Sequence, residues 1–221
     1  MKNNKIRYAL FDLDGTLTNS EGGIARCITT ALNSIGIEDV SDERIKEMIG
    51  PPFRVSMKIF YDMEGEVVDK MLSVYRDQYD IDGWSDNVVY DGIMDLLKKL
   101  HEAGIILAVA TSKPRRFTEK IVKHFGFSPY FSFVGAATDD GVLDRKSAVI
   151  ESVLKNLNIE NRDEVIMIGD RKYDIIGAKE TQVASMGILW GFGDREELAE
   201  AGADYIMETT QDVANFFLGN D

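Results

Sequence analysis

Five short apolar runs with helical patterns between them are the feature that most restricts how this chain can fold. The runs predict buried strands at 6–13, 105–110, 131–135, 165–168 and 183–189. Apolar residues recur at helical spacing between some of them, as in 93–100 and 148–157. Strands that alternate with helices predict an α/β fold in which helices cover both faces of a parallel sheet, making three layers. Such sheets bind ligands beyond the carboxyl ends of their strands.

Residues 18–87 interrupt this alternation. No convincing strand pattern occurs there, and apolar residues recur at helical spacing in 24–35 and 68–79. We therefore expect two domains: an α/β core formed by 1–17 and 88–221, and an inserted helical subdomain formed by 18–87.

The chain is acidic, with a formal net charge of −13 from 25 basic and 38 acidic residues among 221. This balance argues against a nucleic-acid partner, which needs a basic face, and against docking on anionic membranes. The hydrophobic fraction of 44% is typical of a soluble globular protein. Because an acidic protein repels anions, a site for an anionic substrate must be locally positive.

Cysteine and histidine are scarce. Cys27 cannot form an internal disulfide, and His101 and His124 lack the spacing of a zinc site. No apolar segment reaches the roughly 18 residues of a membrane helix, and Asp12 and Asp14 interrupt the N-terminal apolar run too early for a signal peptide. We therefore expect a cytoplasmic protein, as a monomer or a homodimer.

The first predicted strand ends in Asp12-Leu13-Asp14-Gly15-Thr16. Two carboxylates at the mouth of a parallel sheet are hard oxygen ligands that suit Mg²⁺. One of them, held in line with a phosphoryl group, could also act as a nucleophile. The alternative is a strand that simply runs into an Asp-Gly turn. The motif alone does not decide between these interpretations.

Three further motifs follow later predicted strands. They are Thr111-Ser112-Lys113-Pro114, where a helix start could bind an anion, then Lys146, and then Gly169-Asp170 with Asp174 four residues on. Each has an ordinary structural explanation: a helix cap, a surface lysine and an acid-rich helix N-terminus. All of them lie at carboxyl ends of predicted strands, so we expect them to converge on one crevice.

In order and spacing, the four motifs resemble those of the haloacid dehalogenase superfamily of phosphotransferases. The resemblance covers essentially the whole chain, and Asp12 to Ser20 resembles the DxDGTLxxS opening of the phosphoglycolate phosphatase-like branch. It implies a Rossmann-like core, with 18–87 as a small helical cap. It also implies a Mg²⁺-dependent phosphatase that hydrolyses a small soluble phosphomonoester through an aspartyl-phosphate. The leading substrates by resemblance are phosphoglycolate and a nucleoside monophosphate.

The resemblance assigns most of the chemistry to aspartates. Asp12 is the nucleophile, and Asp14 protonates the leaving oxygen and later activates water. Mg²⁺ is bound by Asp12, the backbone carbonyl of Asp14 and Asp170. Asp174 orients the metal ligands and Lys146 without binding the metal directly.

The phosphoryl group has its own set of residues by the same resemblance. Thr111 and Lys146 hold the phosphoryl oxygens. The backbone amides of Leu13 and Ser112 contact the phosphate, and Lys113 adds a charged contact to the substrate.

Substrate choice is expected to come from the cap. The loop 49–54 resembles the cap segment that reaches over the substrate, where Arg54 could bind an acidic leaving group. The alternative leaves Arg54 facing solvent and Phe53 packed within the cap. The Gly-Phe-Gly segment at 191–193 could border the site, but we favour a plain turn, and we interpret Trp190 as a packing residue.

Other functions stay open. A sugar phosphomutase shares this core, but such enzymes usually carry a histidine early in the cap, and no histidine precedes His101. Phosphonate-cleaving relatives replace the second aspartate, so Asp14 argues against that chemistry. A catalytically silent binding or regulatory protein could also use this fold. The complete set of acids, hydroxyl and lysine argues against it.

Overall fold

The computed structural model describes residues 6–49, 51–138, 143 and 145–219. Its internal contacts divide the chain into two compact units, the α/β unit (1–18 and 89–221) and the helical unit (19–88). The two segments that join the units, β2 (Thr18–Asn19) and β3 (Val88–Val89), pair as a two-stranded sheet.

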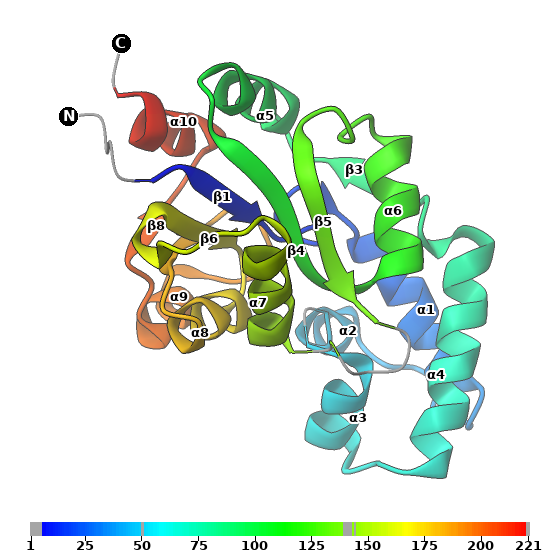
Figure 1. The fold of residues 1–221 in the computed structure, drawn as a ribbon. Coiled ribbons are helices and arrows are strands. Elements are labelled where there is room, and N and C mark those ends of the chain that lie inside the picture. The colour runs from blue at the N-terminus through cyan, green and yellow to red at the C-terminus, as the bar shows by residue number, and fades with distance from the viewer. Residues whose placement is uncertain (1–5, 50, 139–142, 144, 220–221) are drawn as a thin grey trace. The chain divides into compact units, whose positions relative to one another are not determined.

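The α/β unit is built on a six-stranded sheet with the order β5-β4-β1-β6-β7-β8 (Figure 1). Its strands are β1 (Tyr8–Phe11), β4 (Ile106–Pro114), β5 (Phe131–Ala137), β6 (Val165–Gly169), β7 (Ala184–Ile188) and β8 (Tyr205–Met207). All neighbouring strands run parallel. The predicted parallel α/β fold is confirmed. Among the six described strands of this sheet, only β8, a three-residue edge strand, was not predicted.

Helices cover both faces of this sheet. They are α5 (Ile93–Glu102), α6 (Arg115–His124), α7 (Lys146–Asn156), α8 (Lys172–Glu180), α9 (Arg195–Ala201) and α10 (Thr210–Leu218). Leu10 and Met167 belong to one core cluster with four apolar residues of α7 and Ala178 of α8. Their neighbours Phe11 and Ile168 point to the opposite face and are also fully buried. Both faces of the central strands are therefore closed to water.

The helical unit contains α1 (Glu21–Asn33), α2 (Asp42–Glu47), α3 (Phe53–Tyr61), α4 (Glu66–Gln78) and the π-helix η1 (Tyr79–Gly83). The long helices α1 and α4 pack against each other. Ile24, Ile28 and Leu32 form the buried stripe of α1, and Val68 and Met71 that of α4. These two helices follow the two helical patterns expected within this part of the chain.

The loop expected at 49–54 is only partly present. Pro52 precedes α3, and Phe53 and Arg54 already lie in its first turn, so the loop prediction was wrong for these two residues. A proline immediately before a helix lacks only an N–H that the helix would not use. Gly50 lies outside the described residues.

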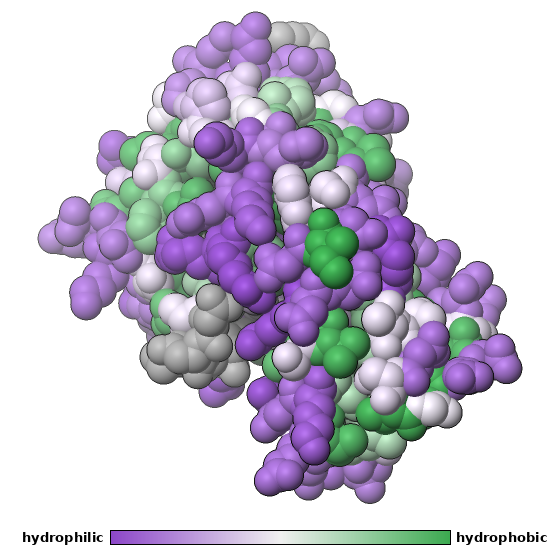
Figure 2. Space-filling model, turned by 90° about the vertical axis from the view of Figure 1, so that its right-hand side faces the viewer, coloured by the Kyte–Doolittle hydropathy of each residue, from purple (hydrophilic) through white to green (hydrophobic). Residues whose placement is uncertain are grey.

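The surface is mainly hydrophilic on the face that Figure 2 shows, with scattered hydrophobic patches. Within the described ranges, no helix has both the length and the apolar character needed to cross a membrane.

Candidate active site

Three of the residues predicted for the site, Asp12, Thr111 and Asp170, lie at the carboxyl ends of three neighbouring strands. β1 runs between β4 and β6 in the sheet (Figure 1). The N–H of Asp12, directly after β1, donates to the carbonyl of Ile168 in β6 at 2.9 Å. Thr111 lies near the end of β4, and Asp170 follows β6. The parallel order of the strands thus gathers motifs that are far apart in the chain.

Lys146 joins two of the acidic side chains. Its ammonium nitrogen lies 2.8 Å from Asp12 Oδ1 and 2.8 Å from Asp174 Oδ1. It also donates to the carbonyl of Ala110 at 3.0 Å. Burial lowers the pKa of Lys146, but the two carboxylates outweigh this effect and raise the pKa above its ordinary value. Lys146 therefore remains a buried cation beside the carboxyl ends of the strands.

Asp12, Asp170 and Asp174 form an acidic cluster, in which one oxygen of each lies within 4.8 Å of the others. Burial raises the pKa of Asp170 well above its usual value, and the nearby Asp174 and Asp12 raise it further. Asp170 accepts hydrogen bonds from the Thr16 hydroxyl at 3.1 Å and the Phe192 N–H at 2.9 Å. Among the described residues it forms no ion pair.

Asp174 differs from Asp170 because one of its oxygens forms an ion pair with Lys146. One oxygen faces Lys146, and the other accepts the N–H of Arg171 at 3.1 Å. Burial raises the pKa of Asp174 to about 6, with Lys146 acting in the opposite direction and Asp12 adding to the rise. A Cβ added at Gly169 would collide with this carboxylate. Asp174 is thus held as a support for Lys146.

This arrangement fits a divalent cation. The cluster offers only oxygen donors, which Mg²⁺ prefers. Asp170 is a fully buried carboxylate that forms no ion pair with any residue that the structure describes. The turn after Asp14 comes close to it, because a Cβ at Gly15 would collide with the Asp170 carboxylate. Gly15 also has a φ of +80°, which favours glycine.

The end of β4 adds a hydroxyl and a second buried lysine. The Thr111 hydroxyl accepts the N–H of Lys113 at 3.2 Å. The Lys113 ammonium lies 2.7 Å from Asp14 Oδ2. Pro114 lies directly before α6, one residue ahead of the first helical position that the sequence suggested for it. Lys113 therefore contacts the carboxylate expected to act as acid and base.

Comparison with known proteins decides the family. The sequence model of the haloacid dehalogenase-like hydrolase family matches residues 9–188 of this chain. The chain belongs to the haloacid dehalogenase-like hydrolase family. This confirms the resemblance found in the four motifs.

Relatives with assigned names are similar over most of the chain. A 5'-nucleotidase of Pseudomonas aeruginosa is 36% identical over 200 residues, which cover 90% of each chain. Tyrosine-protein kinase PtkA of Mycobacterium tuberculosis is 34% identical over 207 residues, 94% of this chain and 67% of that protein. A phosphoglycolate phosphatase of Vibrio parahaemolyticus is 28% identical over 222 residues, 96% of each. The phosphatases among these relatives support a phosphoric monoester hydrolase.

A solved structure agrees in fold and length. The crystal structure of a predicted phosphatase from Clostridium acetobutylicum is 39% identical, with a TM-score of 0.93 over 97% of this chain and 99% of that one.

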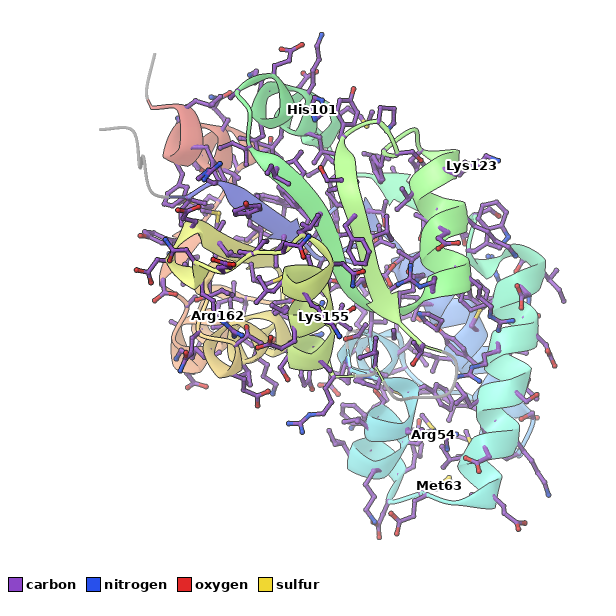
Figure 3. All side chains as sticks on the ribbon, viewed as in Figure 1. Arg54, Met63, His101, Lys123, Lys155 and Arg162 are labelled. Carbon is purple, nitrogen blue, oxygen red and sulfur yellow. The ribbon has the colours of Figure 1, made fainter. Side chains whose placement is uncertain are left out.

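Some predicted site residues of this haloacid dehalogenase-like hydrolase are not part of the cluster in the α/β unit. Arg54 lies on α3 of the helical unit (Figure 3) and pairs with Asp69 of α4. The Phe53 ring packs on the Tyr75 ring within the same unit, with 5.3 Å between the ring centroids. In the loop before Lys146, residues 139–142 and 144 lie outside the described residues.

The segment 190–193 borders Asp170, although we favoured a plain turn there from the sequence. Besides the Phe192 N–H on Asp170, the Trp190 indole N–H donates to the carbonyl of Thr16 at 3.0 Å. The segment is therefore more than the plain turn that we expected. The two glycines at 191 and 193 were the available signal, since glycine permits close approach of two backbones.

Proposed function

We propose that this protein is a Mg²⁺-dependent phosphatase that hydrolyses a small soluble phosphomonoester through an aspartyl-phosphate on Asp12. The observation that carries the proposal is the Lys146 ammonium, 2.8 Å from both Asp12 and Asp174 in the mouth of the sheet. It supplies positive charge beside carboxylates that would otherwise repel an anionic substrate.

The reaction has two steps. In the first, an Asp12 oxygen bonds to phosphorus while the bond from phosphorus to the leaving oxygen breaks, and Asp14 gives that oxygen a proton. In the second, Asp14 takes a proton from water, whose oxygen attacks phosphorus and displaces the Asp12 carboxylate. The products are an alcohol and inorganic phosphate.

The phosphoryl oxygens need donors throughout both steps. We assign this task to the Thr111 hydroxyl, the Lys146 ammonium and the backbone amides of Leu13 and Ser112. Placed at the ends of the strands and at the start of α7, these donors hold the phosphorus in line with the nucleophile.

The metal-binding atoms that we propose are carboxylate oxygens of Asp12 and Asp170 and the carbonyl of Asp14, with Asp174 supporting them. Bound there, Mg²⁺ supplies positive charge that offsets the negative charge of the phosphoryl group.

For the substrate we propose a nucleoside monophosphate first and phosphoglycolate second. The order follows the identities of 36% to the 5'-nucleotidase and 28% to the phosphoglycolate phosphatase. We further propose that the helical unit acts as a cap that selects the leaving group, with Arg54 as its basic contact, and that the protein is cytoplasmic.

Phosphate release from nucleoside monophosphates, phosphoglycolate and sugar phosphates tests the proposal. We expect release with Mg²⁺ and none in excess chelator. Asp12→Asn should lower turnover by about 10³-fold or more, because an amide is a poor nucleophile. Asp95→Asn makes the same chemical change on the exposed side of α5 and should keep full activity.

The alternatives give different products. Full turnover by Asp12→Asn would refute the proposed nucleophile. Glucose 6-phosphate formed from glucose 1-phosphate would identify a phosphomutase, and transfer of phosphate from ATP to a protein tyrosine would identify a kinase. Absence of turnover on every ester, together with capture of a specific partner, would favour a binding protein.

A further inference from the structure

The carboxylate of Asp170 is held from two sides. The Thr16 hydroxyl donates to Oδ1 at 3.1 Å, and the Phe192 N–H donates to Oδ2 at 2.9 Å. The first donor belongs to the turn after β1, and the second to the segment after β7. The orientation of Asp170 therefore depends on where the segment 191–193 lies.

This segment packs on Asp170 through its backbone. A Cβ added at Gly191 would collide with the Asp170 side chain and with the carbonyl of Gly15. A Cβ added at Gly193 would collide with the Asp170 carbonyl. The backbone of the segment therefore lies directly against Asp170, with no room for a side chain between them. A shift of the segment would move the Phe192 N–H relative to Asp170 Oδ2.

Glu197 connects the far end of this segment to the residues after Asp170. It lies in the first turn of α9, where its N–H donates to Asp194 Oδ1 at 2.8 Å. Its carboxylate accepts Arg171 Nε at 2.8 Å and Arg171 Nη2 at 3.3 Å. It also accepts the backbone N–H of Lys172 at 2.8 Å. One side chain thus receives three hydrogen bonds from two consecutive residues.

These contacts close a ring that runs from Asp170 through Arg171 to Glu197 and back through Phe192 to Asp170. We propose that Glu197 is a positioning residue for Asp170. It anchors the segment that carries the Phe192 donor, so that the Asp170 carboxylate keeps one orientation toward the bound cation. Outer hydrogen bonds of this kind commonly set metal affinity.

A second ion pair of α9 provides a matched comparison. The Arg171 and Glu197 side chains are 14% and 21% exposed, whereas those of Arg195 and Glu208 are 55% and 70% exposed. Solvent and salt screen the exposed pair much more strongly. Glu208→Gln therefore removes the same charge and an ion pair to α9 without touching the ring around Asp170.

The inference rests on the proposed metal site, so its test measures metal binding directly. Calorimetric titration of the chelator-stripped full chain with MgCl₂ compares wild type, Glu197→Gln and Glu208→Gln. We expect Glu197→Gln to weaken Mg²⁺ binding by about 10-fold or more, while Glu208→Gln binds like wild type. Turnover of Glu197→Gln should recover when Mg²⁺ is raised to saturation, which general damage to the fold would not produce.

The outcomes separate the two proposals. Wild-type protein that binds no Mg²⁺ would overturn the metal site and this inference together. Wild-type binding with unchanged affinity in Glu197→Gln would overturn the inference alone. If Glu197→Gln does not fold, Arg171→Lys replaces it, because lysine keeps the charge but loses the two-pronged contact. Its Mg²⁺ binding should then be several-fold weaker, and unchanged binding would refute the role of the ring.

Discussion

The ammonium group of Lys113 lies 2.7 Å from Asp14 Oδ2 and joins the end of β4 to the turn after β1. Their side chains are only 6% and 19% exposed. The other carboxylate oxygen, Asp14 Oδ1, is buried and accepts no hydrogen bond from any residue that the structure describes. The ion pair thus orients Asp14 through one oxygen and leaves the other for the proton transfers that we propose.

We expect Lys113→Gln to lower kcat by about 10-fold or more with a smaller change in KM, because Asp14 loses the partner that orients it. Lys123→Gln changes the same charge on the exposed side of α6 (Figure 3) and serves as the control. Steady-state phosphate release at saturating Mg²⁺ measures both variants. A raised KM with unchanged kcat would instead support the substrate contact predicted from the sequence.

Lys146→Gln should destabilise the fold as well as abolish turnover. It leaves the carboxylates of Asp12 and Asp174 without their shared cation, and breaking a buried ion pair costs about 3–5 kcal/mol of unfolding free energy. Urea unfolding in the presence of chelator measures this loss. Lys155→Gln, on the exposed side of the same helix, should unfold like wild type. Identical midpoints for the two variants would contradict the structural role of Lys146.

The strands and the positions of the motifs were predictable because strands buried in a parallel sheet have a recognisable sequence pattern. A strand covered on both faces is a continuous apolar run, as in β1 and β6. The edge strand β8 is only partly buried and carries no such run. Asp12 and Asp170 follow buried strands directly, so the sheet topology brings them together.

Contacts that depend on tertiary structure left weaker signals. The donor at Phe192 is a backbone N–H, which every residue except proline carries. Glu197 is separated from Arg171 by 26 positions, and nothing in the intervening sequence marks them as partners. The helix α2 is only six residues long, too short for a clear apolar period.

The stability of the metal-free protein should depend on pH through Asp174. Burial raises its pKa from 3.8 to about 6, so the folded state binds this proton more tightly than the unfolded state does. The resulting stabilisation is present at low pH, below the ordinary pKa, and is lost as the pH rises through about 6. Mg²⁺ binds the ionised carboxylates, so it should restore more stability at neutral than at acidic pH.

Thermal unfolding at about pH 5 and about pH 7.5, with chelator or MgCl₂, measures this dependence. The increase in Tm on adding MgCl₂ should be larger at the higher pH. In chelator, wild type should lose stability relative to Asp174→Asn as the pH rises, because asparagine does not titrate. Parallel pH curves for the two proteins would show that Asp174 does not carry the effect.

Gly191→Ala, in the segment after β7, should weaken Mg²⁺ binding at the proposed metal site. The new Cβ would collide with the Asp170 side chain and the Gly15 carbonyl, and neither group can move without displacing the site. We expect Mg²⁺ binding to weaken by about 10-fold or more, with a loss of about 1–3 kcal/mol of unfolding free energy from overpacking.

Gly22→Ala is the control for this substitution. Gly22 lies in α1, and the nearest atom to its added Cβ is the flexible end of Asp86 at 3.1 Å. Alanine favours a helix over glycine by about 1 kcal/mol, so this variant should be as stable as wild type or more so. Calorimetry with MgCl₂ and urea unfolding compare the two variants. Wild-type Mg²⁺ affinity in Gly191→Ala would mean that the segment does not hold Asp170 in its binding orientation.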